Sequence, residues 1–207
     1  MTTMKHRFKK TLRHIKTLER IRRRYQPQVR ATEHKPALPP CRERRKVFIF
    51  EGEYVRLCEE TGRYGDFGLE TGGQFFGYTS WEGTPVVAYV LGPGPNAQHS
   101  PAFFRQDESY LVQEGNRIIY MGKLTQIGEW HSHHHLGLST PSGHDAQSMM
   151  RTIRLNDKMH RYLLSIATCN DTTVAATPFM FNADGYETWR WEIIPGESPV
   201  RKLLEKK

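Results

Sequence analysis

The residues with the clearest chemical potential are a group of histidines with an aspartate close behind. The chain runs Glu129-Trp130-His131-Ser132-His133 and, after a loop, Pro141-Ser142-Gly143-His144-Asp145. Residues two apart in a strand point to the same side, so His131 and His133 can present two imidazoles to one point. A hydrolytic zinc takes three nitrogen or oxygen ligands and keeps a position for water, and Asp145 is well placed as the third ligand. The spacing predicts a catalytic zinc site in a metal-dependent hydrolase.

Hydrolysis of a peptide bond also requires a group that takes a proton from water and delivers one to the leaving amine. Two glutamates are candidates for this role. Glu70 stands directly before Thr71-Gly72-Gly73-Gln74-Phe75-Phe76-Gly77, and Glu129 lies two residues before His131 on the same strand face. Spacing alone leaves both open, although Glu129 also fits a structural role beside the metal.

Several of these residues also have a purely structural interpretation. Ser142-x-x-Asp145 has the form of a helix-capping box, in which the two side chains satisfy free amides at a helix start. The two roles are compatible, because a helix start beside the metal offers donors to a developing oxyanion. No Lys-Ser/Thr follows Gly72 and Gly73, so we expect close backbone packing there rather than phosphate binding. Trp130 is expected to be a core or wall residue.

Hydrophobic patterns predict the elements that position these side chains. Residues 124–131 form a strand that carries the first histidines, and a helix opens at Ser142 or Asp145 and continues through Leu155. A short helix is predicted over residues 107–117, and residues 54–58 continue into another that Gly62 and the glycines after it break. Further strands are predicted at residues 47–50, 74–79, 86–91, 162–168, 173–181 and 188–194, with a hairpin connection at residues 80–85.

Charge divides the chain into two parts. Residues 1–46 hold 16 Lys and Arg against 3 Asp and Glu, a net charge of +13, whereas residues 47–207 carry −5. Apolar residues recur every three or four positions from Phe8 to Tyr25, which predicts an amphipathic basic helix, and a proline-containing linker follows it. We therefore expect an N-terminal appendage over residues 1–46 and a folded catalytic domain over residues 47–207.

Composition also indicates the compartment. The cysteines, Cys41, Cys58 and Cys169, are an odd number without a close pair, which favours a reducing cytoplasm over a disulfide framework. No stretch approaches the roughly 18–20 apolar residues that cross a bilayer, so no membrane span is expected. An organelle transit peptide at the basic N-terminus is the less favoured alternative.

The combined pattern resembles a known motif. Glu70-Thr-Gly-Gly-x-x-x-Gly, His131-Ser-His133 and Ser142-x-x-Asp145 are similar to the JAMM motif of JAB/MPN metalloproteases, over roughly residues 47–195. The resemblance implies that Glu70 is the general acid/base and that His131, His133 and Asp145 bind Zn²⁺, while Ser142 stabilises the tetrahedral intermediate. It also implies an α/β fold of the cytidine deaminase-like kind, with a curved, mostly antiparallel sheet flanked by helices.

One spacing departs from the family pattern. Eight residues separate His133 from Ser142, one more than the family usually has. If His133 and His135 were the ligands, the gap would be one residue too short. We prefer His131 and His133, because they directly follow the strand and because a surface loop tolerates an insertion.

Two further segments resemble the bacterial branch of this family, Gly92-Pro-Gly-Pro-Asn96 and Phe104-Arg105-Gln106-Asp107. Such proteins often accompany activating and conjugating-like enzymes of ubiquitin-like systems. The resemblance therefore implies a zinc-dependent isopeptidase or peptidase that cleaves after the C-terminus of a ubiquitin-like or conjugated protein.

The sequence is also compatible with two other functions. Many family members are non-catalytic MPN scaffolds, although these typically lack part of the ligand set that this chain retains. The basic residues 1–46 are also typical of a segment that follows a nucleic-acid backbone. Near-zero zinc content would favour the scaffold, and salt-dependent DNA binding that disappears with residues 1–46 would favour the nucleic-acid-binding protein.

Overall fold

The computed structural model describes residues 45–134, 138–169 and 173–206. The predicted basic helix, its linker and the alternative ligand His135 lie outside these residues. Within them, no helix is long and apolar enough to cross a membrane. Neither Cys58 nor Cys169 forms a disulfide.

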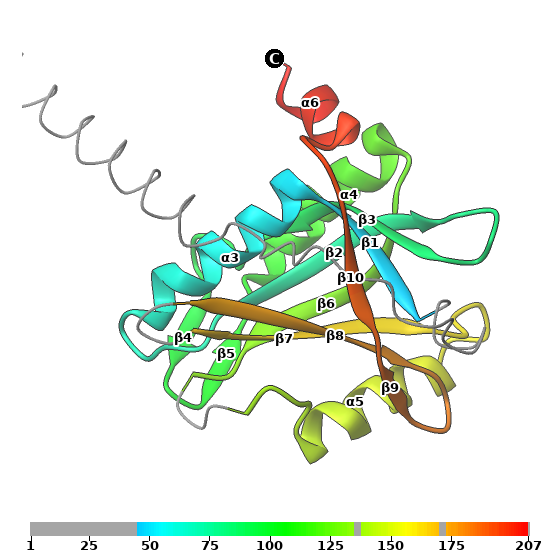
Figure 1. The fold of residues 1–207 in the computed structure, drawn as a ribbon. Helices are drawn as coiled ribbons and strands as arrows, with labels where there is room; N and C mark the ends of the chain where they lie inside the picture. Colours follow the sequence, from blue (N-terminus) through cyan, green and yellow to red (C-terminus); the bar gives the residue numbers. More distant parts are fainter. Residues whose placement is uncertain (1–44, 135–137, 170–172, 207) are drawn as a thin grey trace, which may run out of the picture. The chain divides into compact units, whose positions relative to one another are not determined.

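One large mixed sheet organises the described domain (Figure 1), with the strand order β10-β1-β3-β2-β6-β7-β8-β9. β1 pairs in parallel with both β10 and β3, and β6 pairs in parallel with β7, whereas the other four neighbouring pairs are antiparallel. The strands are β1 (Lys46–Phe50), β2 (Gly72–Thr79), β3 (Pro85–Leu91), β6 (Thr125–Ser132), β7 (Tyr162–Cys169), β8 (Val174–Phe181), β9 (Tyr186–Thr188) and β10 (Arg190–Ile194). The mixed α/β sheet predicted from the sequence is confirmed.

Helices cover both faces of this sheet. Helix α3 (Glu51–Gly65) contacts β1, β3, β6, β7, β8 and β10, so the sheet curves around it (Figure 1). Consecutive strand residues face opposite sides: Phe75 meets Trp191, which also touches Tyr54 of α3, whereas Phe76 packs on Ile118 of α4 (Glu108–Gly122). Helix α5 (Gly143–Arg154) contacts β7. The site must therefore lie where these covering elements leave the sheet open.

The C-terminal helix α6 (Pro199–Glu205) is fixed by a buried ion pair. Arg201 donates to Glu53 of α3 at 2.9 and 2.6 Å, and its guanidinium lies 3.5 Å from the centre of the Tyr89 ring. Glu53 also accepts the N–H of Val90 at 2.7 Å. A buried charge requires such partners, so this contact ties α6 to α3 and β3.

Most predicted elements are confirmed, with a few differences that have physical reasons. Helix α3 runs past Gly62 to Gly65. Helix α4 is longer than predicted, because Gly115 lets the helix approach the sheet: a Cβ there would lie 3.3 Å from the Phe76 ring. The predicted strand over residues 188–194 is divided at Trp189 between β9 and β10. Three elements were not predicted, β4 (Gln98–Ser100), β5 (Phe103–Arg105) and α6.

Candidate metal centre

The two histidines extend from the end of β6, a central strand between β2 and β7. His131 is opposite Gly72 of β2, and the N–H of His133 bonds the Ala167 carbonyl of β7 at 2.9 Å. Ser132 between them is fully buried, as strand alternation predicts. A Cβ at Gly72 would lie 2.6 Å from the Trp130 carbonyl oxygen, which confirms the predicted close backbone packing.

Asp145 lies in the first turn of helix α5, where it forms part of the N-terminal cap. The Ser142 hydroxyl accepts the N–H of Asp145 at 3.1 Å, and the Asp145 carboxylate accepts the N–H of Ser142 at 2.7 Å. The predicted capping box is therefore present, and the helix begins at Gly143. Because the Ser142 oxygen is the acceptor in this box, its hydroxyl hydrogen can still be donated elsewhere.

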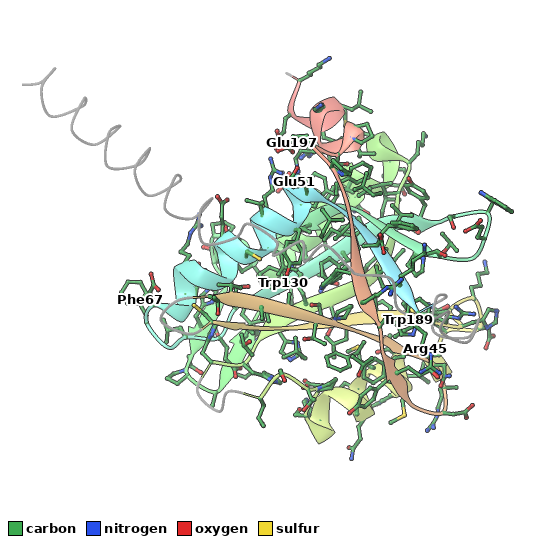
Figure 2. The ribbon with its side chains drawn as sticks, in the orientation of Figure 1. Arg45, Glu51, Phe67, Trp130, Trp189 and Glu197 are labelled. Atoms are coloured by element: carbon green, nitrogen blue, oxygen red, sulfur yellow. The ribbon has the colours of Figure 1, made fainter. Side chains whose placement is uncertain are left out.

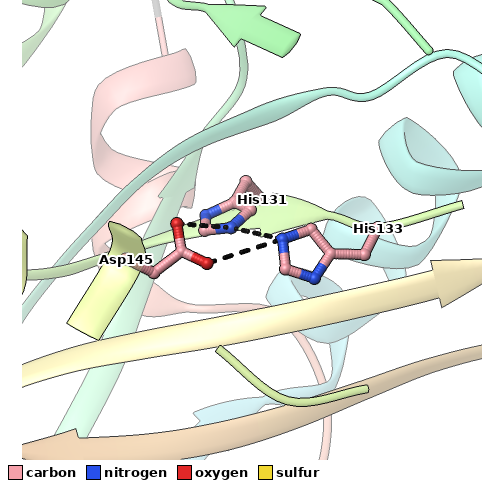
Figure 3. A group of neighbouring side chains, drawn as sticks. All are labelled: His131, His133 and Asp145. Atoms are coloured by element: carbon pink, nitrogen blue, oxygen red, sulfur yellow. Dashed lines mark hydrogen bonds and ion pairs between the residues drawn. The ribbon is translucent and has the colours of Figure 1, made fainter. Parts of the chain in front are cut away.

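The three side chains converge (Figure 3). The two imidazole Nε2 atoms are 3.0 Å apart, and the Asp145 oxygens lie 3.4 Å from that of His131 and 3.6 Å from that of His133. Zinc ligands about 2.0–2.1 Å from a tetrahedral ion are about 3.3 Å from one another. The two Asp145 distances run to different oxygens, Oδ1 and Oδ2. One donor atom from each of the three residues lies within 4.8 Å of the others, which is close enough for the group to hold one metal ion.

The charges of the group also suit a cation. Burial alone raises the pKa of Asp145, but the hydrogen bond and charge of His131, together with the two bonds to Ser142, hold it well below its ordinary value. Burial, with the neighbouring charge of His131, lowers the pKa of His133. An ionised carboxylate and a neutral imidazole are the forms that bind metal.

A backbone contact orients His133. Its Nδ1 lies 3.3 Å from the Leu138 carbonyl oxygen, which can only accept a hydrogen bond. Nδ1 therefore carries the proton and Nε2 presents its lone pair to the group. Metal-binding histidines usually have such a partner on the second nitrogen.

Glu70 lines the same cleft as the three ligand candidates. Burial raises the pKa of its carboxyl group, and the charge of Asp145 contributes in the same direction against the opposing effect of His131. A glutamate with a raised pKa is suited to exchanging protons near neutral pH. The structure thus brings Glu70 and Ser142 to the site that His131, His133 and Asp145 form.

Glu129, the second candidate base, also lines this cleft. Burial raises the pKa of its carboxyl, against the lowering effects of His131 and of a hydrogen bond with Tyr162 of β7. Both glutamates therefore face the cleft, but Glu129 already has a partner in the sheet. This fits the structural role that the sequence also allowed.

The cleft is an open groove of about 760 Å³. The hairpin of β4 and β5 forms one apolar wall with Pro101, Ala102, Phe103 and Phe104, and Leu138 and Met149 contribute further apolar surface. Trp130 lies in the middle of the domain (Figure 2), is 1% exposed and also contributes to the cleft lining, as predicted for a core or wall residue. An open cleft with an apolar wall is accessible to a polypeptide substrate.

Two parts of the site were not predicted from the sequence. The hairpin wall was not predicted, although Phe103 and Phe104 are adjacent aromatic residues in a polar stretch. Ser132 was expected only to point away, but its hydroxyl accepts the N–H of Thr71 at 2.9 Å and its own N–H bonds the Thr71 carbonyl at 2.8 Å. The strand that carries the histidines is thereby joined to the segment that carries Glu70.

No protein-family model matches this chain, and two of the proteins that are similar to it are described below. A protein of Sinorhizobium fredii (strain NBRC 101917 / NGR234) named probable metalloprotease y4qB is 29% identical over 110 residues, which are 52% of this chain and 66% of that relative. The match thus spans slightly less than two thirds of the relative's length. The solution structure of a protein from Desulfitobacterium hafniense is 18% identical, with a TM-score of 0.53, and the match covers 73% of this chain and 93% of that one. This second likeness shows the mixed α/β fold.

Proposed function

We propose that this chain is a JAMM-type zinc metallopeptidase of the JAB/MPN family. The observation that carries the proposal is that five residues matched to the motif, spread from Glu70 to Asp145, line one cleft. A chance match of the sequence would not require these positions to meet. The likeness to a protein named probable metalloprotease supports peptidase activity and a bound metal.

His131, His133 and Asp145 are the proposed zinc ligands, since two nitrogen donors and one oxygen donor form a set typical of hydrolytic zinc. When bound, zinc supplies Lewis acidity that polarises a carbonyl group and makes water more acidic. The capping box and the Leu138 carbonyl hold two of these side chains in place before any metal arrives.

The remaining chemistry falls to Glu70 and Ser142. Glu70 takes a proton from the attacking water and passes it to the leaving amine. The Ser142 hydroxyl donates to the substrate carbonyl oxygen as negative charge develops there, and the N-terminus of α5 adds a favourable dipole. Glu129, which is hydrogen-bonded to Tyr162, has a structural role in this proposal.

The proposed substrate is a ubiquitin-like or otherwise conjugated protein, cleaved after its C-terminus. The open groove and the apolar hairpin wall suit an extended tail better than a compact small molecule. Activating and conjugating-like enzymes of the same system are the proposed partners, in the cytoplasm. Nucleic acid is a further proposed partner for the basic residues 1–46.

The test offers ubiquitin-like proteins fused to a C-terminal reporter to three samples: wild type, Glu70→Gln and chelator-treated wild type. We expect cleavage after the ubiquitin-like C-terminus by wild type alone, with zinc still bound in Glu70→Gln. Loss of a general acid/base should lower kcat by about 10²–10⁴-fold. Full activity in Glu70→Gln would overturn its assignment, and cleavage that survives chelation would overturn the metallopeptidase.

A further inference from the structure

Glu70 lies in the connection between α3 and β2, outside any regular element, so its position depends on contacts from elsewhere. The N–H of Leu69 bonds the Tyr64 carbonyl in the last turn of α3 at 3.1 Å, and the N–H of Glu70 bonds the Ser100 carbonyl of β4 at 2.8 Å. On the other side, Thr71 is held by Ser132. Neighbouring groups therefore anchor this connection residue by residue.

The carbonyl of Glu70 has an anchor of a different kind, the side chain of His99. Its Nδ1 lies 2.9 Å from the Glu70 carbonyl oxygen. Because a carbonyl oxygen only accepts, Nδ1 is the donor in this bond. The imidazole N–H thus serves as the donor that a backbone N–H of a neighbouring strand would provide in a regular β-sheet.

The His99 ring is itself held in place from two sides. It stacks on Tyr64 with ring centres 3.8 Å apart and planes 13° from parallel, and the Phe104 ring lies 5.5 Å away. His99 and Tyr64 line a second cavity of about 500 Å³, whereas Phe104 and Glu70 line the catalytic cleft. His99 thus forms part of the wall behind Glu70 and does not line the cleft itself.

We propose that His99 is a positioning residue that fixes the Glu70 carboxylate relative to the metal group. The inference rests on the proposed function, in which Glu70 is the proton carrier. Without the bond from Nδ1, the Glu70 carbonyl oxygen loses the only hydrogen bond that the structure shows for it within the described residues. A misplacement of about 1 Å in a reacting group can lower a rate by about 100-fold.

Two substitutions separate the hydrogen bond from the packing. His99→Phe keeps an aromatic ring on Tyr64 and removes the donor, whereas His99→Asn removes the ring and keeps an N–H donor near the position of Nδ1. For a peptidase reporter substrate, we expect His99→Phe to lower kcat by about 10–100-fold with unchanged KM and zinc content. His99→Asn should stay within about threefold of wild type. Equal losses in both variants, no loss in His99→Phe, or a changed KM alone would overturn the proposal.

A readout independent of activity separates this inference from the proposed function. Long-range ¹H–¹⁵N NMR of zinc-loaded wild-type protein should find the His99 proton on Nδ1, and the signal should be absent in His99→Phe. A proton found on Nε2 alone would overturn the inference whatever the activity. If wild type cleaves no ubiquitin-like fusion while His99 carries its Nδ1 proton, the substrate proposal fails and the contact to Glu70 stands.

Discussion

Replacing Ser132 with alanine should destabilise the protein, because it removes a buried hydroxyl that accepts from the Thr71 N–H and donates to the Thr71 carbonyl. Ser132 and Thr71 are both fully buried, and the Ser132 hydroxyl accepts the Thr71 N–H at 2.9 Å. The Thr71 carbonyl keeps the Ser132 N–H as a donor at 2.8 Å. The substitution therefore leaves one buried N–H without a partner, which costs about 1–3 kcal/mol.

The chain offers a matched control on the neighbouring strand. Ser165 of β7 is also fully buried, but its hydroxyl has no hydrogen-bond partner among the described residues. Ser165→Ala leaves no new unpaired group and removes a buried hydroxyl that lacks a bond, so its stability should stay equal or rise. The comparison isolates the hydrogen bond from the loss of a small buried side chain.

Thermal and urea unfolding of chelator-treated protein measure the difference without a contribution from bound metal. For a domain of this size, about 1–3 kcal/mol corresponds to a fall in Tm of about 2–12 °C for Ser132→Ala. Ser165→Ala should show no fall. If both variants lose equal stability, or if Ser165→Ala loses more, the reasoning about the link between Ser132 and Thr71 is refuted.

Three further outcomes follow from individual residues. Because burial raises the pKa of Glu70, the ionised carboxylate lowers the stability of the folded, metal-free protein. Glu70→Gln should therefore stabilise that protein at pH 7, and the gain should disappear as the pH falls below the pKa of Glu70 in the unfolded chain. Urea unfolding as a function of pH measures the sign of this effect. Burial raises the pKa of Cys58 to about 12, so about one Cys58 thiol in 10⁴ is ionised at pH 8. Peptide mass spectrometry after iodoacetamide treatment should therefore find Cys169 alkylated before Cys58, and equal rates for these two residues would contradict this. The His135→Ala variant should retain zinc in elemental analysis. Loss of zinc from this variant would favour His133 and His135 as the ligand pair.

The convergence of His131, His133 and Asp145 could be predicted from sequence because it depends on short-range rules. Alternation along a strand places His131 and His133 together, and the capping-box spacing brings Ser142 and Asp145 to one helix start. Both rules act over a few residues, and both are confirmed in β6 and α5. Glu70 was assigned only through the family resemblance, since spacing gave it no advantage over Glu129.

The hairpin and the anchor of Glu70 could not be predicted in this way. Strands β4 and β5 have three residues each, too few for alternation to become visible. His99 is one of 10 histidines and belongs to no motif, and it meets Glu70 across 29 positions only because the hairpin folds against the α3 connection. Sequence patterns mark where a side chain points within an element, but not which distant element covers it.

The order of the sheet shows the same limit. β1 was predicted as a buried strand, but its pairing partner was not predicted. It pairs in parallel with β10, where Lys46 lies opposite Arg190, and this pairing joins the two ends of the domain. Helix α4 was predicted too short, because a glycine such as Gly115 indicates a helix end in the sequence. In the structure, Gly115 instead lies against the Phe76 ring within the helix. Tertiary packing decided both cases.

Zinc stoichiometry shows whether His133 and Asp145 hold the metal. Wild type, His133→Ala, Asp145→Ala and His144→Ala are prepared in parallel, dialysed against zinc-free buffer and analysed by elemental mass spectrometry. His144 lines the same cleft without belonging to the converging group, so it is the matched control. We expect one zinc per chain in wild type and His144→Ala and almost none in the other two variants. Equal zinc in all four proteins, or none in wild type, would contradict this.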